Sequence, residues 1–127
     1  MKDIEILLLD ADSDRRNNFA SRLRVQGFST VLSFEGFQTI HLIEKCKYSA
    51  LIIIGNLQDM PGLEVLSLTR ISQSKSDLPI IYISTSSDQE EVLNAFELGA
   101  NDIIVYSDKC FASLVEKLKK YTVVKKK

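Results

Sequence analysis

The sequence predicts an α/β fold, a doubly wound, five-stranded parallel sheet with helices on both faces. Short and almost continuous apolar runs recur along the 127 residues, as expected for strands that are covered on both faces. Each run is followed by a segment with apolar residues at helical spacing, and glycine, proline or a capping residue lies at most junctions. Five strand–helix units joined by right-handed crossovers build a single parallel sheet.

Two strand–helix units are predicted for the first part of the chain. Residues Ile4–Leu9 form the first strand, and the helix after it starts with Ser13 as its N-cap and stops at Gly27. The second strand covers Ser29–Leu32 and leads into the second helix. The residues expected to face the core are Phe19, Ala20 and Leu23 in the first helix, and Phe37, Ile40, Ile43 and Cys46 in the second.

The third and fourth units follow the same alternation. Leu51–Ile54 is the most apolar run and is predicted to be the central strand, with Pro61 opening the helix after it. The fourth strand covers Pro79–Ser84, and the pattern SDQE at Ser87–Glu90 predicts a capping box for the fourth helix, which Gly99 ends. Core-facing residues are expected at Leu63, Leu66 and Ile71 in the third helix, and at Val92, Ala95 and Phe96 in the fourth.

The fifth unit closes the predicted domain. Ile103–Val105 is the last strand, and Asp108 is expected to cap the last helix. The inward residues of that helix are expected to be Phe111, Leu114, Val115 and Leu118. One domain is therefore predicted for residues 1–121, and the basic residues 122–127 (TVVKKK) are expected to be a disordered tail.

Charge and composition argue against several classes of function. Sixteen basic and seventeen acidic residues give a net charge of −1, so no overall field attracts nucleic acid or an anionic membrane. No apolar stretch approaches the ~18 residues that a membrane span needs, and the N-terminus lacks the pattern of a signal peptide. Cys46 and Cys110 match no metal or disulfide framework, so we expect reduced thiols in a cytoplasmic protein that binds neither nucleic acid nor membrane.

A doubly wound sheet places its functional site beyond the carboxyl ends of its strands. At these ends the sequence has polar and apolar residues that do not form an obvious catalytic set. The segments to inspect are Asp10–Asp12, Ile54–Asn56, Ser84–Ser86 and Val105–Ser107.

Four motifs resemble those of the response-regulator receiver domain family, over almost the whole chain. They are ILLLDADSDRR at the first strand, LQDMPGLEVL after the third, PIIYIS at the fourth and FELGANDIIV leading into the fifth. The resemblance implies a flavodoxin-like strand order of 2-1-3-4-5. It also implies a site in which an aspartate at the end of the third strand accepts a phosphoryl group, with Mg²⁺ held by that aspartate and by two acids after the first strand. A hydroxyl and a lysine then hold the phosphate.

Most of this site is absent from the sequence. The resemblance places the first acid on Asp10, the second on Ala11 and the phosphoacceptor on Ile54. The other positions fall on Ser84 for the hydroxyl, Thr85 for the small residue after it, Tyr106 for the lysine and Ser107 for the following proline. Of the four charged groups that phosphoryl transfer needs, only Asp10 remains, because Ala11, Ile54 and Tyr106 carry no charge.

The sequence therefore predicts a degenerate pseudo-receiver, which is not an enzyme and needs no cofactor. We expect it to act by phosphorylation-independent binding of another signalling protein or an output domain. The resemblance places the partner surface on the fourth helix, fifth strand and fifth helix, where Asn94, Glu97, Ile103 and Lys117 are expected to be exposed. The aromatic residue that relays phosphorylation in receivers is replaced by Ile103. Neither the oligomeric state nor the partner follows from the sequence.

Three alternatives stay open at this point. Asp59 or Asp10 could serve as a shifted phosphoacceptor. Asp10 and Asp12 could bind Mg²⁺ weakly; the competing interpretation is that Asp10 ends a strand, Asp12 faces solvent and Arg15 or Arg16 offsets their charge. The hydroxyl-rich segment Ser84–Asp88 could bind a flavin phosphate or another small ligand at a helix N-terminus, although no glycine opens this loop.

Overall fold

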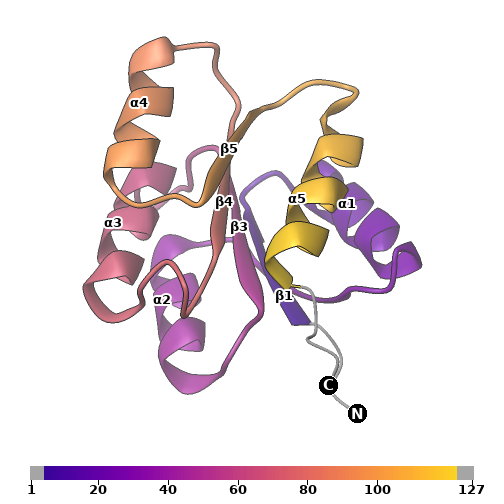
Figure 1. Cartoon of the computed structure of the whole chain (residues 1–127), viewed down its shortest axis with the longest axis horizontal. Helices are drawn as coiled ribbons and strands as arrows, with labels where there is room; N and C mark the ends of the chain where they lie inside the picture. The colour runs from indigo at the N-terminus through magenta and orange to yellow at the C-terminus, as the bar shows by residue number, and fades with distance from the viewer. Residues whose placement is uncertain (1–4, 123–127) are drawn as a thin grey trace.

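The computed structural model describes residues 5–122, which form five strands and five helices in strict alternation (Figure 1). The strands are β1 (Glu5–Asp10), β2 (Ser29–Ser33), β3 (Ala50–Ile54), β4 (Ile80–Ser84) and β5 (Asp102–Val105). The helices are α1 (Ser13–Val25), α2 (Gly36–Lys45), α3 (Gly62–Ser72), α4 (Gln89–Glu97) and α5 (Cys110–Thr122). All strand pairs are parallel and the sheet order is β2-β1-β3-β4-β5, which confirms the predicted fold.

The sheet separates two hydrophobic layers (Figure 1). Helices α1 and α5 pack on one face, and α2, α3 and α4 pack on the other. Every residue of β3 and β4 is buried, because both faces of these central strands are covered by helices. This burial explains why the sequence shows continuous apolar runs instead of an alternating pattern.

The register of the strands decides which residues meet at the carboxyl edge of the sheet. Asp10, the last residue of β1, pairs with Ile54, the last residue of β3. Ile54 pairs in turn with Ile83 of β4, and Ser84 pairs with Val105 of β5. The positions singled out from the sequence therefore lie at one end of the sheet, as the topology requires.

Several helix starts differ from the prediction by one or two residues. The N-cap of α1 is Asp12, whose side chain accepts a hydrogen bond from the Arg15 N–H, so Ser13 is the first helical residue. The N-cap of α4 is Asp88, whose carboxylate accepts a hydrogen bond from the Glu90 N–H, and the predicted capping box at Ser87 does not form. An aspartate carboxylate caps as well as a serine hydroxyl does, so sequence spacing alone does not choose between adjacent candidates.

The other boundaries shift slightly as well. Pro61 occupies the N-cap position of α3, whose first residue is Gly62. Helix α5 starts at Cys110, two residues after the predicted cap Asp108, and it includes Thr122, which is buried. Strand β1 starts at Glu5; the predicted first residue, Ile4, and residues 123–127 of the predicted tail lie outside the described residues.

Four of the residues expected in the core are exposed. They are Phe37, Cys46, Ile71 and Phe96. Phe37 lies in the first turn of α2 and Ile71 in the last turn of α3. Periodicity identifies the face of a helix but not how far along that face the core reaches.

Within residues 5–122, no helix is long and apolar enough to cross a membrane.

Candidate functional site

The residue at the phosphoacceptor position is part of the hydrophobic core. Ile54 is fully buried and belongs to the apolar cluster on the α1 and α5 side of the sheet. Asp10 is also fully buried, and it lies beside Ile54 in the neighbouring strand. The structure thus places one carboxylate and one isoleucine side by side at the end of the two central strands.

The Asp10 carboxylate is held by Arg15 from the first turns of α1. The Arg15 Nε donates to Asp10 Oδ2 at 2.7 Å, and Nη2 donates to Oδ1 at 2.7 Å. The backbone N–H of Asp12 donates to Oδ1 at 3.0 Å. This is a bidentate guanidinium–carboxylate pair, the strongest geometry for such a contact, and the hydrogen bond to Asp10 raises the pKa of Arg15 against the opposing effect of burial.

Arg15, not Arg16, is therefore the residue that offsets the charge of Asp10. Arg16 Nη1 donates to the backbone carbonyl of Asp10 at 2.8 Å, and its guanidinium stands over the Phe34 ring at 5.6 Å. Asp12 is exposed, and the hydrogen bond from the Arg15 N–H at its helix cap lowers its pKa. The pair of acids considered from the sequence is thus divided, since Asp10 faces inward to Arg15 and Asp12 caps α1.

The donor set does not fit Mg²⁺. Magnesium requires oxygen ligands in octahedral array, and both oxygens of Asp10 already accept hydrogen bonds from a cation. Ala11 and Ile54 offer no side-chain oxygen at the other two acidic positions of the site. Within the described part of the chain, no group of three or more His, Cys, Asp or Glu side chains could hold a metal ion.

Tyr106 covers the guanidinium of Arg15. The Arg15 Cζ lies 5.4 Å from the centre of the Tyr106 ring, in the range of a cation–π contact. The same ring stacks on Phe19 of α1, with centroids 6.2 Å apart and an interplanar angle of 28°. At the position where the resemblance expects a lysine, this chain therefore has an aromatic ring that packs against a cation of its own.

The Ser84 hydroxyl is used within its own turn. Ser84 is fully buried, and its Oγ donates to the Ser86 carbonyl at 2.6 Å and accepts from the Ser86 N–H at 3.2 Å. Thr85 is exposed, and its side chain packs close to the backbone of Gly55. A Cβ atom added at Gly55 would lie 3.1 Å from the Thr85 side chain. Ser107 is exposed, and its Oγ accepts from the Lys109 N–H at 3.3 Å.

The rest of the segment Ser84–Asp88 is similarly engaged. Ser86 Oγ accepts from the Asp88 N–H at 3.0 Å, and Asp88 caps α4. The hydroxyls of Ser84 and Ser86 and the carboxylate of Asp88 thus satisfy backbone groups of this loop and of the first turn of α4. The arrangement is that of a turn leading into a capped helix.

Asp59 is directed to the start of α2. Its Oδ1 accepts from the Gly36 N–H at 2.8 Å and its Oδ2 accepts from the Phe37 N–H at 3.0 Å. Desolvation works against the charged form, but the hydrogen bonds from Phe37 and Gly36 hold the pKa of Asp59 below its usual value. Asp59, considered above as a shifted phosphoacceptor, therefore caps a helix that precedes it in the chain.

The residues expected on the partner surface differ in exposure. Asn94 and Glu97 are exposed on α4. Ile103 is only partly exposed and packs against the core on the α3 and α4 side, and Lys117 forms an ion pair with Asp102 at 3.4 Å. The apolar residues of this surface do not follow from the sequence. The helical spacing of apolar residues predicts that Phe96 faces the core, and it predicts nothing for Leu93.

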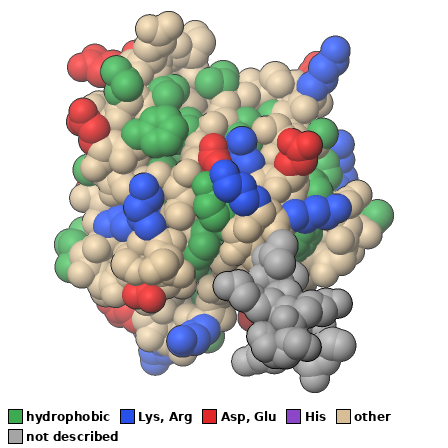
Figure 2. Space-filling view, viewed as in Figure 1, with side chains coloured by type: hydrophobic (Ala, Val, Ile, Leu, Met, Phe, Trp, Pro, Cys, Tyr) green, Lys and Arg blue, Asp and Glu red, His purple; other side chains and the backbone are tan. Residues whose placement is uncertain are grey.

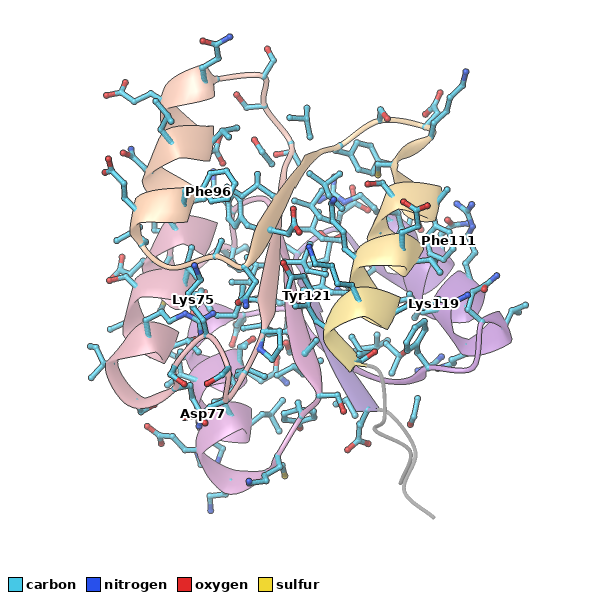
Figure 3. All side chains as sticks on the ribbon, in the orientation of Figure 1. Lys75, Asp77, Phe96, Phe111, Lys119 and Tyr121 are labelled. Carbon is cyan, nitrogen blue, oxygen red and sulfur yellow. The ribbon has the colours of Figure 1, made fainter. Side chains whose placement is uncertain are left out.

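The most exposed large apolar side chains on α4 and β5 are Leu93, Phe96 and Val105. The exposed fractions are 62% for Leu93, 50% for Phe96 and 49% for Val105. Figure 2 shows hydrophobic side chains gathered over α4 on this face, and Figure 3 shows Phe96 on the side of α4 that faces β5. We call Leu93, Phe96 and Val105 the α4 patch.

A hollow of about 410 Å³ lies elsewhere, beyond the last turns of α2 and α3. Cys46 and Tyr48 are among its lining residues, and burial, followed by the neighbouring Cys46, raises the pKa of Tyr48 to about 12. None of its lining residues is Asp10, Arg15, Ile54 or Tyr106, the four residues that we call the Asp10 pocket.

Comparison with known proteins identifies the same family across the chain. The family model "Response regulator receiver domain" matches residues 6–117. The chain is 31% identical over 104 residues to the chemotaxis protein CheY homolog of Campylobacter jejuni, covering 80% of each chain. It is 28% identical over 120 residues to the chemotaxis protein CheY-3 of Vibrio cholerae, covering 94% of this chain and 92% of the relative.

Solved structures agree with this result. The response regulator TrrA from Thermotoga maritima, in complex with Mg²⁺ and beryllofluoride, superposes with a TM-score of 0.82 at 26% identity, covering 95% of this chain and 99% of that one. The receiver domain of a sensor histidine kinase from Pseudomonas aeruginosa, with a magnesium ion in its active-site cleft, gives a TM-score of 0.85 at 23% identity. The coverage there is 97% of this chain and 100% of that one.

Proposed function

Because the chain belongs to the response regulator receiver domain family of two-component signalling, we propose that it is a pseudo-receiver, a member that signals by binding partners without being phosphorylated. The observation that carries the proposal is the bidentate Arg15–Asp10 pair beside Ile54. A cation of the chain itself is bound to the remaining acid, and no nucleophile stands at the end of β3.

The chemistry of phosphoryl transfer supports this proposal. The reaction needs a nucleophilic oxygen, and it needs positive charge to offset the charge of the donor and of the transferred group. Ile54 has no oxygen, and both oxygens of Asp10 are engaged with Arg15. The TrrA structure holds Mg²⁺ with beryllofluoride, whereas in this chain Arg15 supplies the positive charge next to Asp10, which supports a site that works without a divalent ion.

The relay that would follow phosphorylation is also unsupported by the residues present. The Ser84 hydroxyl is tied to Ser86 in a buried turn, and Ile103 replaces the aromatic residue of the receiver relay. We propose that the surface of α4, β5 and α5 is available to a partner without prior activation. The partner is another signalling protein or an output domain, in a cytoplasmic setting where the free thiols of Cys46 and Cys110 stay reduced.

Exposure to a small phosphodonor tests the proposal directly. The protein is incubated with acetyl phosphate and Mg²⁺, with a phosphorylatable receiver in parallel, and both are analysed by intact-mass spectrometry. We expect an acyl-phosphate adduct on the control receiver and none on this chain. A stoichiometric adduct here would overturn the proposal, and the variants Asp59→Asn and Asp10→Asn would then identify which aspartate is the acceptor.

Beryllofluoride provides a second readout that needs no chemical step. Amide spectra of the ¹⁵N-labelled protein are recorded with and without Mg²⁺ and beryllofluoride. We expect no saturable shifts at the pocket residues Asp10, Ile54 and Tyr106. Saturable shifts at these amides would show that the pocket binds the phosphate analogue and would contradict the proposal.

A further inference from the structure

Charge is distributed very unevenly along this chain. Residues 76–108 contain seven acidic residues and no Lys, Arg or His, so all sixteen basic residues lie outside this stretch. The stretch includes β4 and β5, the two neighbouring strands at one edge of the sheet, and the helix α4 that connects them. This stretch therefore carries a charge of −7 in a chain with a net charge of only −1. Lys117 of α5 pairs with Asp102, and Arg70 of α3 bonds to Asn101 and to the Gly99 carbonyl, so the acids of α4 and its N-terminal loop remain uncompensated within the described residues.

The apolar α4 patch lies inside this acidic region. Leu93 and Phe96 are three positions apart on α4, so their side chains are neighbours on the helix surface. Val105 and Ile103 alternate onto the same face of β5, and Ile103 packs toward α4, so Val105 faces the α4 side as well. The exposed acids around the patch are Asp88, Glu90 and Glu97.

The patch is presented by a fixed helix. The hydroxyl of the buried Tyr82 on β4 donates to Glu91 Oε2 at 2.5 Å, which ties α4 to the sheet. Ala95 of α4 is fully buried in the core, and Asp88 caps the N-terminus of the helix. A surface that is already ordered loses little conformational entropy when a partner binds.

We propose that the α4 patch binds an amphipathic helix whose apolar residues are flanked by Lys and Arg. This inference rests on the proposed function and names the chemistry of its partner. Apolar anchors of the partner would cover Leu93, Phe96 and Val105, while its basic residues face Glu90, Glu97 and Asp88. The same acids repel phosphate groups, which excludes nucleic acids and anionic lipid surfaces as occupants of this patch.

A pair of synthetic peptides tests this inference on the whole chain. Both are about 18 residues long, with Leu at the same i, i+3, i+4 and i+7 positions, and they differ only in having Lys or Glu at the polar positions. Each is titrated into the ¹⁵N-labelled protein without any phosphodonor. We expect the Lys peptide to shift amides of α4 and β5, to bind roughly tenfold or more tightly than the Glu peptide, and to weaken as NaCl rises from about 0.05 to about 0.5 M.

Matched variants distinguish binding at the α4 patch from nonspecific binding to exposed apolar or acidic residues. Leu93→Ser with Phe96→Ser should weaken binding of the Lys peptide by roughly tenfold or more. The control Val25→Ser with Ile71→Ser changes two apolar residues on α1 and α3 that are even more exposed, and it should leave binding unchanged. Glu90→Gln with Glu97→Gln should weaken binding, and Glu44→Gln with Glu64→Gln, on α2 and α3, should not.

Three results would overturn the inference. They are equal binding of the two peptides, shifts that map outside α4 and β5, and self-association of the chain that is abolished by the same Leu93 and Phe96 changes. The last result would mean that a second copy covers the patch. None of them depends on an acyl-phosphate adduct, so a failure here is distinguishable from a failure of the proposed function.

Discussion

Replacing Arg15 with methionine removes the partner of a fully buried carboxylate, and the loss of stability measures how much the fold depends on that pair. Breaking a buried ion pair by removing one member costs about 3–5 kcal/mol. Arg15 itself is 22% exposed, so water reaches its side of the pair, and the Asp12 N–H still donates to Asp10 in the variant. We therefore expect a loss of about 3 kcal/mol, at the lower end of that range. Methionine keeps apolar contact with the Tyr106 ring, so most of the loss reports on the charge.

Urea unfolding followed by circular dichroism gives this quantity. With a slope of about 2 kcal/mol per molar urea, the midpoint of Arg15→Met should fall by about 1.5 M. Arg15→Lys keeps the positive charge but loses the bidentate hydrogen bonds, so its urea midpoint should lie between those of Arg15→Met and the wild type. The control is Lys117→Met, which breaks the ion pair between Lys117 and Asp102. The Lys117 side chain is 29% exposed, the Asp102 side chain is 20% exposed, and their charged atoms are 3.4 Å apart. Both members of this longer pair are partly exposed and neither is fully buried, so the loss should stay close to that of a surface pair, about 0–1 kcal/mol.

A double variant decides the sign of the effect. In Arg15→Met the charge of Asp10 is buried without a counter-charge, whereas in Asp10→Asn with Arg15→Met the buried charge is gone. The double variant should therefore be more stable than Arg15→Met alone. A loss below about 1 kcal/mol for Arg15→Met, or a double variant less stable than the single one, would refute the assignment of Arg15 as the counter-charge of the pocket.

Three further predictions concern the loops, α4 and alkaline pH. Asp59→Ala should cost about 1 kcal/mol at pH 7, because α2 loses its cap. The pKa of Asp59 is lowered from 3.8 in the folded state, so this contribution is present above about pH 4, and urea unfolding of wild type and variant should converge as the pH falls below 3.8. Tyr82→Phe should remove one hydrogen bond of about 1 kcal/mol and speed amide exchange in α4 more than in α5; equal rates in both helices would contradict a role in holding α4. Burial raises the folded-state pKa of Tyr82, and of Tyr48 to about 12, so the stability that these two protonated phenols contribute is fully present below pH 10 and should decline as the pH rises above 10. Thermal unfolding between pH 9 and pH 11 should show a smaller decline for Tyr82→Phe than for the wild type.

The fold could be predicted because each strand coincides with a short apolar run in the sequence. All five strands were found within two residues of their positions, since a strand covered on both faces leaves little choice of residue. The exposure of Phe37 and Ile71 could not be predicted, because both lie in the end turns of their helices, and periodicity does not show how far along a helix the core reaches. Apolar residues at a helix end satisfy the periodicity of the core without entering it.

The sequence shows Ala11, Ile54 and Tyr106 at positions where the resemblance expects an acid, the phosphoacceptor and a lysine, but it does not show how the residues at these positions pack. Arg15 and Arg16 are adjacent, and only the turn at the start of α1 decides which of them reaches the Asp10 carboxylate. The contact between Arg15 and Tyr106 joins segments that are far apart in the sequence, so no local pattern indicates it.

The role of Asp59 depends on contacts between loops. The Met60 side chain lies so close to the start of α2 that a Cβ at Gly36 would come within 2.6 Å of Met60 Cγ. This glycine lets the loop after β3 approach the first turn of α2, which brings the Asp59 carboxylate to the free N–H groups of Gly36 and Phe37. A preceding helix is an unexpected partner from sequence spacing alone, because caps are usually supplied by the residue next to the helix.

The Arg15–Asp10 pair also bears on how a pseudo-receiver can be regulated. A ligand shifts a conformational equilibrium only by the difference in its affinity for the two states. In the proposed pseudo-receiver, Asp10 is paired with Arg15 and Ile54 stands at the acceptor position, so neither an ion nor a phosphoryl group at this site shifts the equilibrium. Under the proposed function, control must therefore act at the partner surface, through the amount of partner or through competition for the α4 patch. Strengthening or removing the Arg15–Asp10 pair should change the stability of the fold while leaving the affinity of the α4 patch nearly constant, because Arg15 belongs to α1, which lies on the opposite face of the sheet from α4.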